Sequence, residues 1–367
     1  MPIRCAYGFR NGEGAEKGMK LPQKLLEMTP YDPTENRYPV KLDANESFFP
    51  IPQPVRQRIL RAVEGLDFNR YPDPNCTRLR AAAAGAFGVQ AENLMAGNGS
   101  DELISLIVSA FVPKGGTLMV IEPDFSMYRF YAQLCEVSVL SHEKAPDFRV
   151  SPQKILDKAA RQRPDVLIFS NPCNPAGQGF TREEIRLLLK NLPETLVVVD
   201  EAYMDFWDQS MLPEIETYEN LMILRTMSKA YAMAGIRLGF AAARKELIEQ
   251  FNKCRSPFNV SSLTQAAGTA ALQDTSWALG QISQILENKR LLQEQLSSLA
   301  EQTGAFQVLE SHTNFVLVRT GRCSELYQGL LERGICVRNF ERLSLLRITA
   351  GSREENARLL EALGEVL

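Results

Sequence analysis

Histidine is nearly absent from this sequence, because His142 and His312 are the only two among 367 residues. Neither a Gly-x-Ser-x-Gly string nor a Walker A string occurs. A Ser–His–Asp triad depends on a histidine base, and protein zinc sites draw mainly on histidines and paired cysteines. We therefore expect neither a His-based catalytic triad nor a bound metal.

Paired cysteines and long apolar runs are missing as well. The seven cysteines are scattered and include no Cys-x-x-Cys pair, which argues against a disulfide framework and suits a reducing compartment. The longest apolar run, residues 103–112, is interrupted by serines and is too short to span a bilayer. The first 20 residues contain no apolar segment like that of a secretory signal peptide. These absences predict a cytoplasmic protein without a membrane partner.

Neither sign of charge dominates the chain. The sequence has 41 Lys and Arg residues against 44 Asp and Glu residues, a formal net charge of −3, and no block of like charge. Proteins that bind nucleic acid usually carry a basic excess or stripe, so no nucleic-acid partner is expected. Hydrophobic residues make up 45% of the chain, close to the globular average, and the length predicts two domains.

Strand-like and helical patterns alternate from about residue 56 to residue 250, which is typical of a parallel sheet built from βαβ units. Predicted strands, apolar throughout as in a sheet covered on both faces, lie at 118–121, 166–169, 196–199 and 221–224. Predicted helices lie at 54–65, 77–87, 100–111, 151–161 and 182–189. After residue 257 the pattern predicts a smaller α+β domain: a long helical region at 263–304, a helix at 324–333, and strands at 306–309, 314–319, 334–340 and 345–349.

These patterns divide the chain into four segments. We expect a disordered extension at residues 1–20, an N-terminal arm and substrate-entrance segment at 21–50, a large domain at 51–256 and a small C-terminal domain at 257–367.

Four polar clusters each follow a strand-like run: residues 97–102, 170–177, 200–203 and 225–229. Ligands of open α/β sheets bind outside the carboxyl ends of the strands. Any single polar loop needs no ligand to explain it, but four clusters of these residue types predict one shared site.

Each cluster suggests a role, and each has a plainer explanation. The backbone from Gly97 to Ser100 precedes a predicted helix and could hold an anion, or could be an ordinary turn. Asp200 ends an apolar run, where a carboxylate is costly unless it faces a cation, although it could instead cap a helix.

Two basic residues complete this set. Lys229 could form a Schiff base with a carbonyl, or could be a solvated surface charge. Arg237 lies in a weakly polar setting where a phosphate or carboxylate partner would satisfy it. An anion cradle, a carboxylate, a lysine and an internal arginine together fit the requirements of pyridoxal phosphate.

With these residues the sequence resembles the class I/II aminotransferases of fold type I, and most closely their histidinol-phosphate aminotransferase branch. The resemblance covers nearly the whole chain after about Leu21. The segments that carry it are 41–47, 70–72, 97–102, 171–177, 199–203, 228–239, 258–260 and 346–349. It implies an α/β fold with a large, mostly parallel sheet between helices and a smaller α+β domain, and it makes 51–256 the cofactor-binding domain.

The resemblance also implies a role for each matching residue of the cofactor site. Lys229 would hold pyridoxal phosphate as an internal aldimine and move a proton during catalysis. Asp200 would pair with the pyridinium nitrogen, while Asn174 and Tyr203 would hydrogen-bond the phenolic oxygen. Further expected cofactor contacts are Phe125 on the ring face, the phosphate-site residues Gly99, Ser100, Asp101, Thr226, Ser228 and Arg237, and Tyr71 from a second subunit.

Substrate residues follow from the same resemblance. Arg347 would bind the acidic group of the substrate in a two-pronged contact, and Arg338 matches a second arginine used for substrate phosphate. Arg338 could equally end an exposed strand. Asn45 and Tyr31 would line the substrate entrance.

Three departures from the branch bear on substrate. Phe125 stands where Tyr is usual, the segment between Arg338 and Arg347 is shorter than usual, and residues 30–34 read Pro-Tyr-Asp-Pro-Thr rather than Pro-Tyr-x-Pro-Gly.

We therefore expect a homodimeric aminotransferase with shared active sites, which moves an amino group between a small donor, L-histidinol phosphate in the first place, and 2-oxoglutarate. An aminotransferase for aromatic or other L-amino acids and a pyridoxal-phosphate decarboxylase for a phosphorylated amino acid remain alternatives on the same scaffold. A regulatory cofactor-binding protein would need an attached DNA-binding module, which the first twenty residues are too short to supply. A nicotinamide-dependent dehydrogenase would need a third glycine after Gly97-x-Gly99.

Overall fold

The computed structural model describes residues 19–28 and 38–367. It divides the chain into two units, Met1–Asp32 and Pro33–Leu367. In the described part of the first unit, the structure has one short helix, α1 (Gln23–Glu27). Most of the predicted disordered extension, 1–20, lies outside the described residues.

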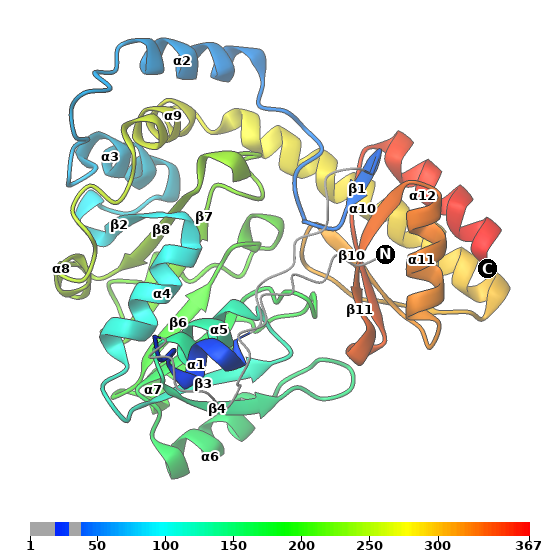
Figure 1. The fold of residues 1–367 in the computed structure, drawn as a ribbon, viewed down its shortest axis with the longest axis horizontal. Coiled ribbons are helices and arrows are strands. Elements are labelled where there is room, and N and C mark those ends of the chain that lie inside the picture. Colours follow the sequence, from blue (N-terminus) through cyan, green and yellow to red (C-terminus); the bar gives the residue numbers. More distant parts are fainter. Residues whose placement is uncertain (1–18, 29–37) are drawn as a thin grey trace. The chain divides into compact units, whose positions relative to one another are not determined.

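The second unit is built on a seven-stranded sheet in the order β2-β8-β7-β6-β5-β3-β4 (Figure 1). Its strands are β2 (Leu94–Asn98), β3 (Thr117–Glu122), β4 (Ser138–Glu143), β5 (Val166–Ser170), β6 (Leu196–Asp200), β7 (Leu221–Thr226) and β8 (Leu238–Ala243). All neighbouring strands are parallel except that β8 is antiparallel to β2 and β7. The mostly parallel large sheet predicted from the sequence is therefore confirmed.

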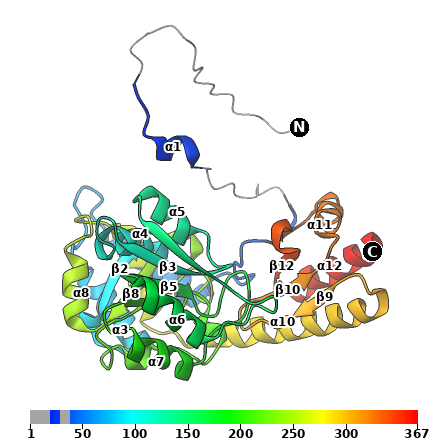
Figure 2. The ribbon, with the colours of Figure 1, turned by 90° about the horizontal axis from the view of Figure 1, so that it is seen from below.

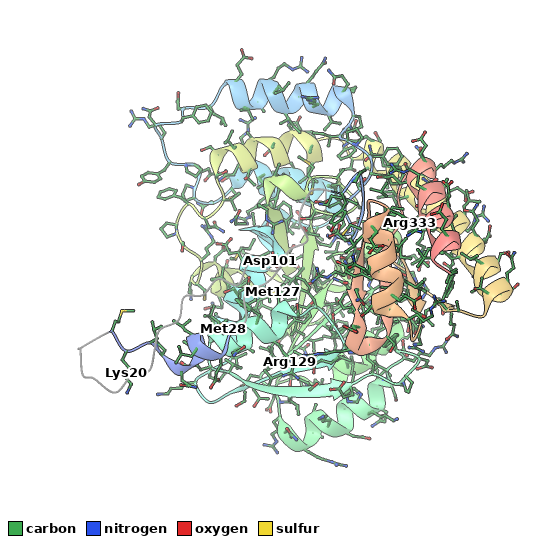
Figure 3. The ribbon with its side chains drawn as sticks, turned by 45° about the vertical axis from the view of Figure 1, so that its right-hand side comes forward. Lys20, Met28, Asp101, Met127, Arg129 and Arg333 are labelled. Carbon is green, nitrogen blue, oxygen red and sulfur yellow. The ribbon has the colours of Figure 1, made fainter. Side chains whose placement is uncertain are left out.

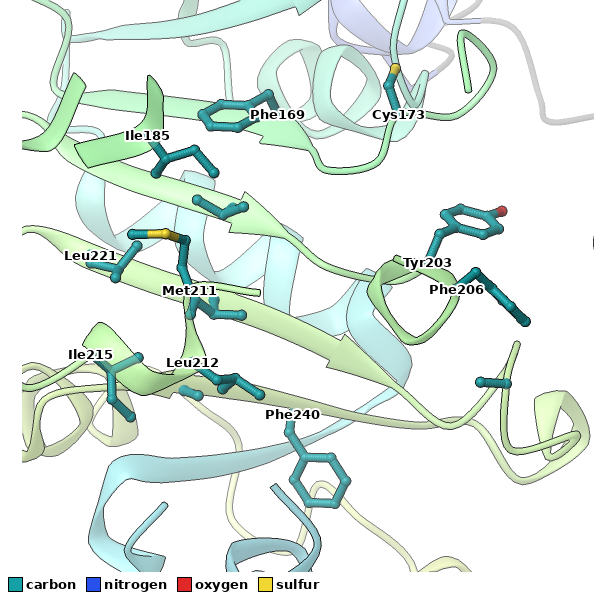
Figure 4. Close-up of a cluster of buried hydrophobic side chains, with 14 of the residues drawn as sticks. Phe169, Cys173, Ile185, Tyr203, Phe206, Met211, Leu212, Ile215, Leu221 and Phe240 are labelled. Atoms are coloured by element: carbon teal, nitrogen blue, oxygen red, sulfur yellow. The ribbon is translucent and has the colours of Figure 1, made fainter. Parts of the chain in front are cut away.

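Helices cover both faces of this sheet because its strands are apolar on both faces. In β5, Leu167 and Phe169 belong to one core cluster, whereas Val166 and Ile168 belong to another. The first cluster (Figure 4) includes side chains of α3 (Thr77–Phe87), α6 (Pro152–Gln162), α7 (Arg182–Asn191) and α9 (Ser262–Leu272). The second includes side chains of α4 (Gly99–Phe111), α5 (Met127–Leu134) and α8 (Lys245–Asn252).

A smaller, five-stranded sheet has the order β1-β11-β12-β10-β9. Its strands are β1 (Val40–Leu42), β9 (Gln307–Leu309), β10 (Phe315–Arg319), β11 (Ile335–Phe340) and β12 (Leu345–Thr349), and α11 (Cys323–Glu332) and α12 (Arg353–Val366) contribute to its core. The predicted strands and helix of this region are confirmed. The unpredicted strand β1 pairs in parallel with β11, so this stretch of the N-terminal arm belongs to the smaller sheet.

The long helical region predicted at 263–304 is confirmed as helical, but it is divided into two helices. These helices are α9 and α10 (Ser276–Thr303), and between them Asp274 Oδ1 accepts hydrogen bonds from Ser276 N at 3.0 Å and Ser276 Oγ at 2.7 Å, which forms a turn before α10. Helix α9 packs against α3 and α2 (Gln53–Glu64), at the large sheet. The predicted domain boundary near residue 256 stays a prediction.

Helix α10 connects the cores of the two sheets. Ile282 and Ile285 in its first half belong to the first core cluster, whereas Leu292 and Leu296 in its second half pack with the smaller sheet. Figure 2 shows the helix extending from the large sheet to the smaller one. None of the helices in residues 19–28 and 38–367 is long and apolar enough to cross a membrane.

Candidate active site

The four predicted clusters lie at one edge of the large sheet, since β2, β5, β6 and β7 run in the same direction. These strands end at Asn98, Ser170, Asp200 and Thr226. Ser170 and Asp200 are direct partners across β5 and β6. The prediction that the clusters converge is confirmed.

An anion cradle forms where β2 meets β8. Helix α4 begins at Gly99, whose φ of +77° suits glycine, and a Cβ at Gly99 would lie 2.7 Å from Arg237 Nη2. A Cβ at Gly239 would lie 2.5 Å from Ser100 N, so both glycines allow the close approach of the backbone. Arg237 Nη2 lies 2.9 Å from Asp101 Oδ2, and Figure 3 labels Asp101 at the start of α4. The backbone N–H groups of a helix N-terminus beside a guanidinium favour a bound phosphate.

Ser228 and Thr226 border this cradle from β7. Thr226 Oγ1 donates to Ser228 Oγ at 2.9 Å and accepts from Ser228 N at 3.1 Å. Leu238 lies between these residues and the cradle: it is the strand partner of Asn98, and its carbonyl accepts a hydrogen bond from Met227 N at 3.0 Å. The structure therefore brings the predicted phosphate-site residues of this chain together.

Asp200 is a buried carboxylate, 3% exposed. It accepts hydrogen bonds from the Tyr128 hydroxyl at 2.8 Å and from Ala202 N at 3.1 Å. No lysine or arginine pairs with it among residues 19–28 and 38–367, and burial raises its pKa to about 7. A cation brought to Asp200 would satisfy its charge.

Lys229 lies on the loop after β7, and its Nζ donates to the carbonyl of Ala44 at 2.8 Å. This amine also lies 5.8 Å from the centre of the Tyr203 ring. The Tyr203 hydroxyl accepts from Asn45 Nδ2 at 2.8 Å. Asn45 in turn accepts from Thr349 Oγ1 at 3.1 Å through its side chain, which links β12 of the smaller sheet to this edge. The lysine, the tyrosine and the predicted entrance residue Asn45 therefore lie together.

Arg347 is buried between the two sheets. Its Nη1 donates to Asn174 Oδ1 and its Nη2 to the Asp43 carbonyl. Its guanidinium lies 5.4 Å from the centre of the Phe315 ring and 5.6 Å from that of Phe340. These contacts hold the guanidinium beside Asn174, another predicted cofactor residue.

Arg338 is half-buried and lies directly opposite Arg347 in the antiparallel pair β11–β12. Residues directly opposite each other project from the same face of a sheet. The short 341–344 link between the strands therefore places the second arginine on the face that carries Arg347.

Phe125 follows β3, and its ring lies edge-on to that of Tyr128 at 5.7 Å between centroids. Through Tyr128 it is joined to Asp200. Tyr71, in contrast, is 81% exposed and stacks on Phe258 at 4.6 Å, in a hollow of about 420 Å³ that Phe68 and Leu263 also line. Within this chain Tyr71 is not brought to the other site residues. Tyr31 lies outside the described residues.

Three contacts of the site were not predicted: the Ala44 carbonyl, the Asp43 carbonyl and the Tyr128 hydroxyl. Backbone carbonyls carry no sequence signal. Tyr128 carried none either, because Phe125 precedes α5 and helix periodicity does not relate the two residues.

The family model and the similar proteins found by comparison all point to aminotransferases. Residues 38–363 match the family model described as aminotransferase class I and II. The chain is 36% identical over 342 residues to a histidinol-phosphate aminotransferase of Clostridium novyi, covering 92% of this chain and 95% of that protein. It is 38% identical over 348 residues to one of Clostridium kluyveri, covering 94% and 98%.

A solved structure agrees with these relatives. The histidinol-phosphate aminotransferase of Sinorhizobium meliloti, in complex with pyridoxal-5'-phosphate, superposes with a TM-score of 0.85 at 26% identity, covering 95% of this chain and 98% of that one. Sequence, fold and the arrangement of polar residues at the strand ends agree, and the chain belongs to the class I and II aminotransferases.

Proposed function

We propose that this chain is a pyridoxal-phosphate-dependent histidinol-phosphate aminotransferase, which passes the amino group of L-histidinol phosphate to 2-oxoglutarate. The observation that carries the proposal is Asp200, a carboxylate buried without a lysine or arginine partner in the described part of the chain, at the same sheet edge as Lys229 and the anion cradle. The relatives from Clostridium support the choice of substrate.

The residues at the strand ends fit this cofactor. A pyridinium nitrogen is the cation that Asp200 lacks, and the start of α4 with Arg237 and Ser228 suits a phosphate. When bound, pyridoxal phosphate supplies an electron sink that stabilises negative charge at the substrate Cα. Gly99, Ser100, Asp101 and Thr226 complete the proposed phosphate site, and Phe125 is proposed to pack on the ring face.

Four side chains would then handle protons and charge at the cofactor. Lys229 would hold the cofactor through its aldehyde in the resting enzyme, and its Nζ, once released, would move the proton at the substrate Cα. Asp200 keeps the proton on the ring nitrogen. Tyr203 and Asn174 would hydrogen-bond the phenolic oxygen of the cofactor, and Asn174 contacts Arg347, the residue proposed to bind the substrate anion.

Histidinol phosphate carries no carboxylate, so its phosphate must use the pocket that takes a carboxylate of 2-oxoglutarate. Arg347 with Arg338 opposite it presents two planar guanidiniums on one sheet face, which suits a dianion. Asn45 connects the N-terminal arm to Tyr203 and Thr349 at the proposed entrance, to which we also assign Tyr31.

The test begins with the purified protein and pyridoxal phosphate. We expect a yellow protein with an absorption band at the edge of the visible range, and amino transfer from histidinol phosphate to 2-oxoglutarate. Phenylalanine and tyrosine as donors, and carbon dioxide release from a phosphorylated amino acid, serve as comparisons. Transfer from the aromatic donors alone would indicate an aromatic aminotransferase, carbon dioxide release a decarboxylase, and a colourless protein would contradict the proposal.

We also propose a homodimer with shared active sites. Tyr71 belongs to an exposed aromatic patch with Phe68, Phe258 and Leu263, the kind of surface that an interface covers. There it is free to reach the phosphate site of a neighbouring copy. The cytoplasmic location expected from the sequence stays a prediction.

A further inference from the structure

Tyr128 is a buried tyrosine to which neither the sequence nor the family resemblance assigned a role. It lies in the first turn of α5 and is 1% exposed. Its hydroxyl donates to Asp200 Oδ2 at 2.8 Å, while Ala202 N donates to Asp200 Oδ1 at 3.1 Å. Each carboxylate oxygen therefore has one donor from this chain, and only the donor from Tyr128 comes from a distant part of the sequence.

The segment before α5 is held in place by the residue next to Asp200 in the sheet. Ser170, the direct partner of Asp200 across β5 and β6, donates through both its hydroxyl and its N–H to the carboxylate of Asp124. Asp124 also accepts from Phe125 N at 2.7 Å and lies 3.7 Å from Lys144 Nζ. Two adjacent strand ends thus position the loop and the tyrosine that follows it.

The surroundings of Asp200 disfavour its charge. Burial is the main cause that raises its pKa, and the carboxylates of Asp124 and of Asp101 on α4 raise it further. The hydrogen bond from Tyr128 acts in the opposite direction, because a donor stabilises the ionised carboxylate. Tyr128 remains a neutral donor, since burial and the charge of Asp200 raise its own pKa well above the ordinary value.

We propose that Tyr128 is a positioning residue, which holds Asp200 in one orientation and in its ionised form so that the carboxylate can pair with the cofactor ring nitrogen. The inference rests on the proposed function, because it concerns the group that faces the cofactor. Two residues three positions apart would then have separate tasks: Phe125, just before α5, would cover the ring face, and Tyr128, in its first turn, would hold the acid at the ring nitrogen.

Tyr128→Phe is the direct test because it removes only the hydroxyl and keeps the ring in its contact with Phe125. Asp200 then loses its only side-chain donor among the described residues, and its pKa rises. In the holoenzyme we expect the acidic limb of the kcat/KM profile to move to higher pH by about one unit, as the loss of a charge-assisted hydrogen bond implies. Near pH 9 the rate should stay within about twofold of the wild type.

Cofactor affinity supplies a readout that does not depend on turnover. A protonated Asp200 cannot pair with the pyridinium, so the Kd for pyridoxal phosphate should rise about tenfold at pH 6 in Tyr128→Phe and return close to the wild-type value at pH 9. Tyr218→Phe, which removes a hydroxyl from a partly buried tyrosine packed against the first core cluster, is the matched control and should change neither quantity. The Tm of each apoprotein checks folding.

A loss of the same factor at every pH would mean that Tyr128 only fills space, and would overturn the inference. An unshifted acidic limb together with unchanged cofactor affinity would overturn it as well. Failure of the proposed function looks different, because the wild type itself would then bind no pyridoxal phosphate or transfer no amino group.

If Tyr128→Phe proves unstable, a double-mutant cycle with Asp200→Asn, measured by urea unfolding of the apoprotein, provides the test. The coupling energy between the two side chains is expected to be present at pH 8 and weaker at pH 5. Equal coupling at both pH values would overturn the inference.

Discussion

At the scale of single residues, Lys229 and Asp200 carry the proposed chemistry, and their surroundings differ. The Lys229 amine is half-buried and donates to a backbone carbonyl, Ala44 O, which a competing partner can replace. Asp200 is buried, hydrogen-bonded on both oxygens and held at the end of β6. The amine is therefore the group that can move during a reaction, while the carboxylate stays in place.

Lys229→Ala should abolish transamination while leaving the fold intact. Proton transfer by a positioned side chain alone contributes a factor on the order of 10²–10⁴, and the substitution also removes the covalent attachment of the cofactor. Turnover with histidinol phosphate measures the loss, and the absorption band tests whether cofactor still binds. Lys245→Ala, on the exposed start of α8, is the control. Undiminished turnover of Lys229→Ala would contradict the assignment.

Asp200→Asn should lower kcat by about 10- to 150-fold, because an amide cannot hold the ring-nitrogen proton by charge. In the apoprotein, by contrast, the charge of Asp200 should lower stability. Burial raises the pKa of Asp200 from 3.8 to about 7, so the folded state binds a proton on Asp200 more tightly than the unfolded state does. The unfolding free energy of the apoprotein therefore falls as the pH rises from 4 to 7. Three pKa units correspond to about 4 kcal/mol.

The apo variant Asp200→Asn lacks this titration. In urea unfolding it should lose less stability than the wild type between pH 5 and pH 8. Parallel pH dependences of the two proteins, or a near-normal kcat, would mean that the carboxylate is only a structural cap.

At the scale of elements, the β11–β12 hairpin places the two arginines that are proposed to hold the substrate anion. The strands are antiparallel and the link of residues 341–344 is short, so Arg338 lies opposite Arg347. Like charges in that position repel each other, and an anion shared between them turns the repulsion into attraction. This register is the basis of the proposal that the two arginines bind a doubly charged phosphate.

Arg338→Ala should raise the KM for histidinol phosphate by about 10- to 150-fold, the equivalent of one lost charge-assisted contact of about 1.5–3 kcal/mol. The effect on phenylalanine, a donor with a neutral tail, should be smaller, whereas Arg347→Ala should weaken every substrate. Arg342→Ala, exposed in the same hairpin link, is the control. Equal losses for both donors in Arg338→Ala would point to a general aromatic aminotransferase.

At the scale of the molecule, one helix and one surface matter most. Helix α10 contributes Ile282 to the core of the large sheet and Leu296 to that of the smaller sheet. The same helix therefore packs against both sheets that carry the candidate site residues. The aromatic patch around Tyr71 is exposed in the single chain. A two-fold partner would bury it, since dimers of this symmetry are the commonest assembly.

Mixing Tyr71→Phe chains with Lys229→Ala chains should restore activity that neither parent has. In a hybrid dimer one site combines the Lys229 of the first chain with the Tyr71 of the second, and random exchange should give about a quarter of the wild-type rate. Sedimentation of each parent checks the assembly. An active protein that sediments as a monomer would contradict the shared site.

Local pattern was enough to predict four of the seven strands of the large sheet, β3, β5, β6 and β7, and the polar residues that follow them. Apolar runs such as 166–169 indicate strands buried on both faces, and Asp200 or Lys229 directly after such a run falls at the ligand-binding edge because all parallel strands end there. The family resemblance rested on the same segments. The break between α9 and α10 was missed because a turn at Asp274 interrupts an otherwise continuous helical pattern.

What the sequence by itself determined is thus the large parallel sheet, the smaller α+β region and the list of chemical groups at the site. Only the tertiary structure decided which of them meet: that β1 joins β11, that Tyr128 donates to Asp200 across 72 positions, and that Ala44 accepts from Lys229 across 185. Periodicity is a property of neighbouring residues, whereas these contacts depend on how separate elements pack. A hydrogen bond between distant residues leaves no pattern in either segment.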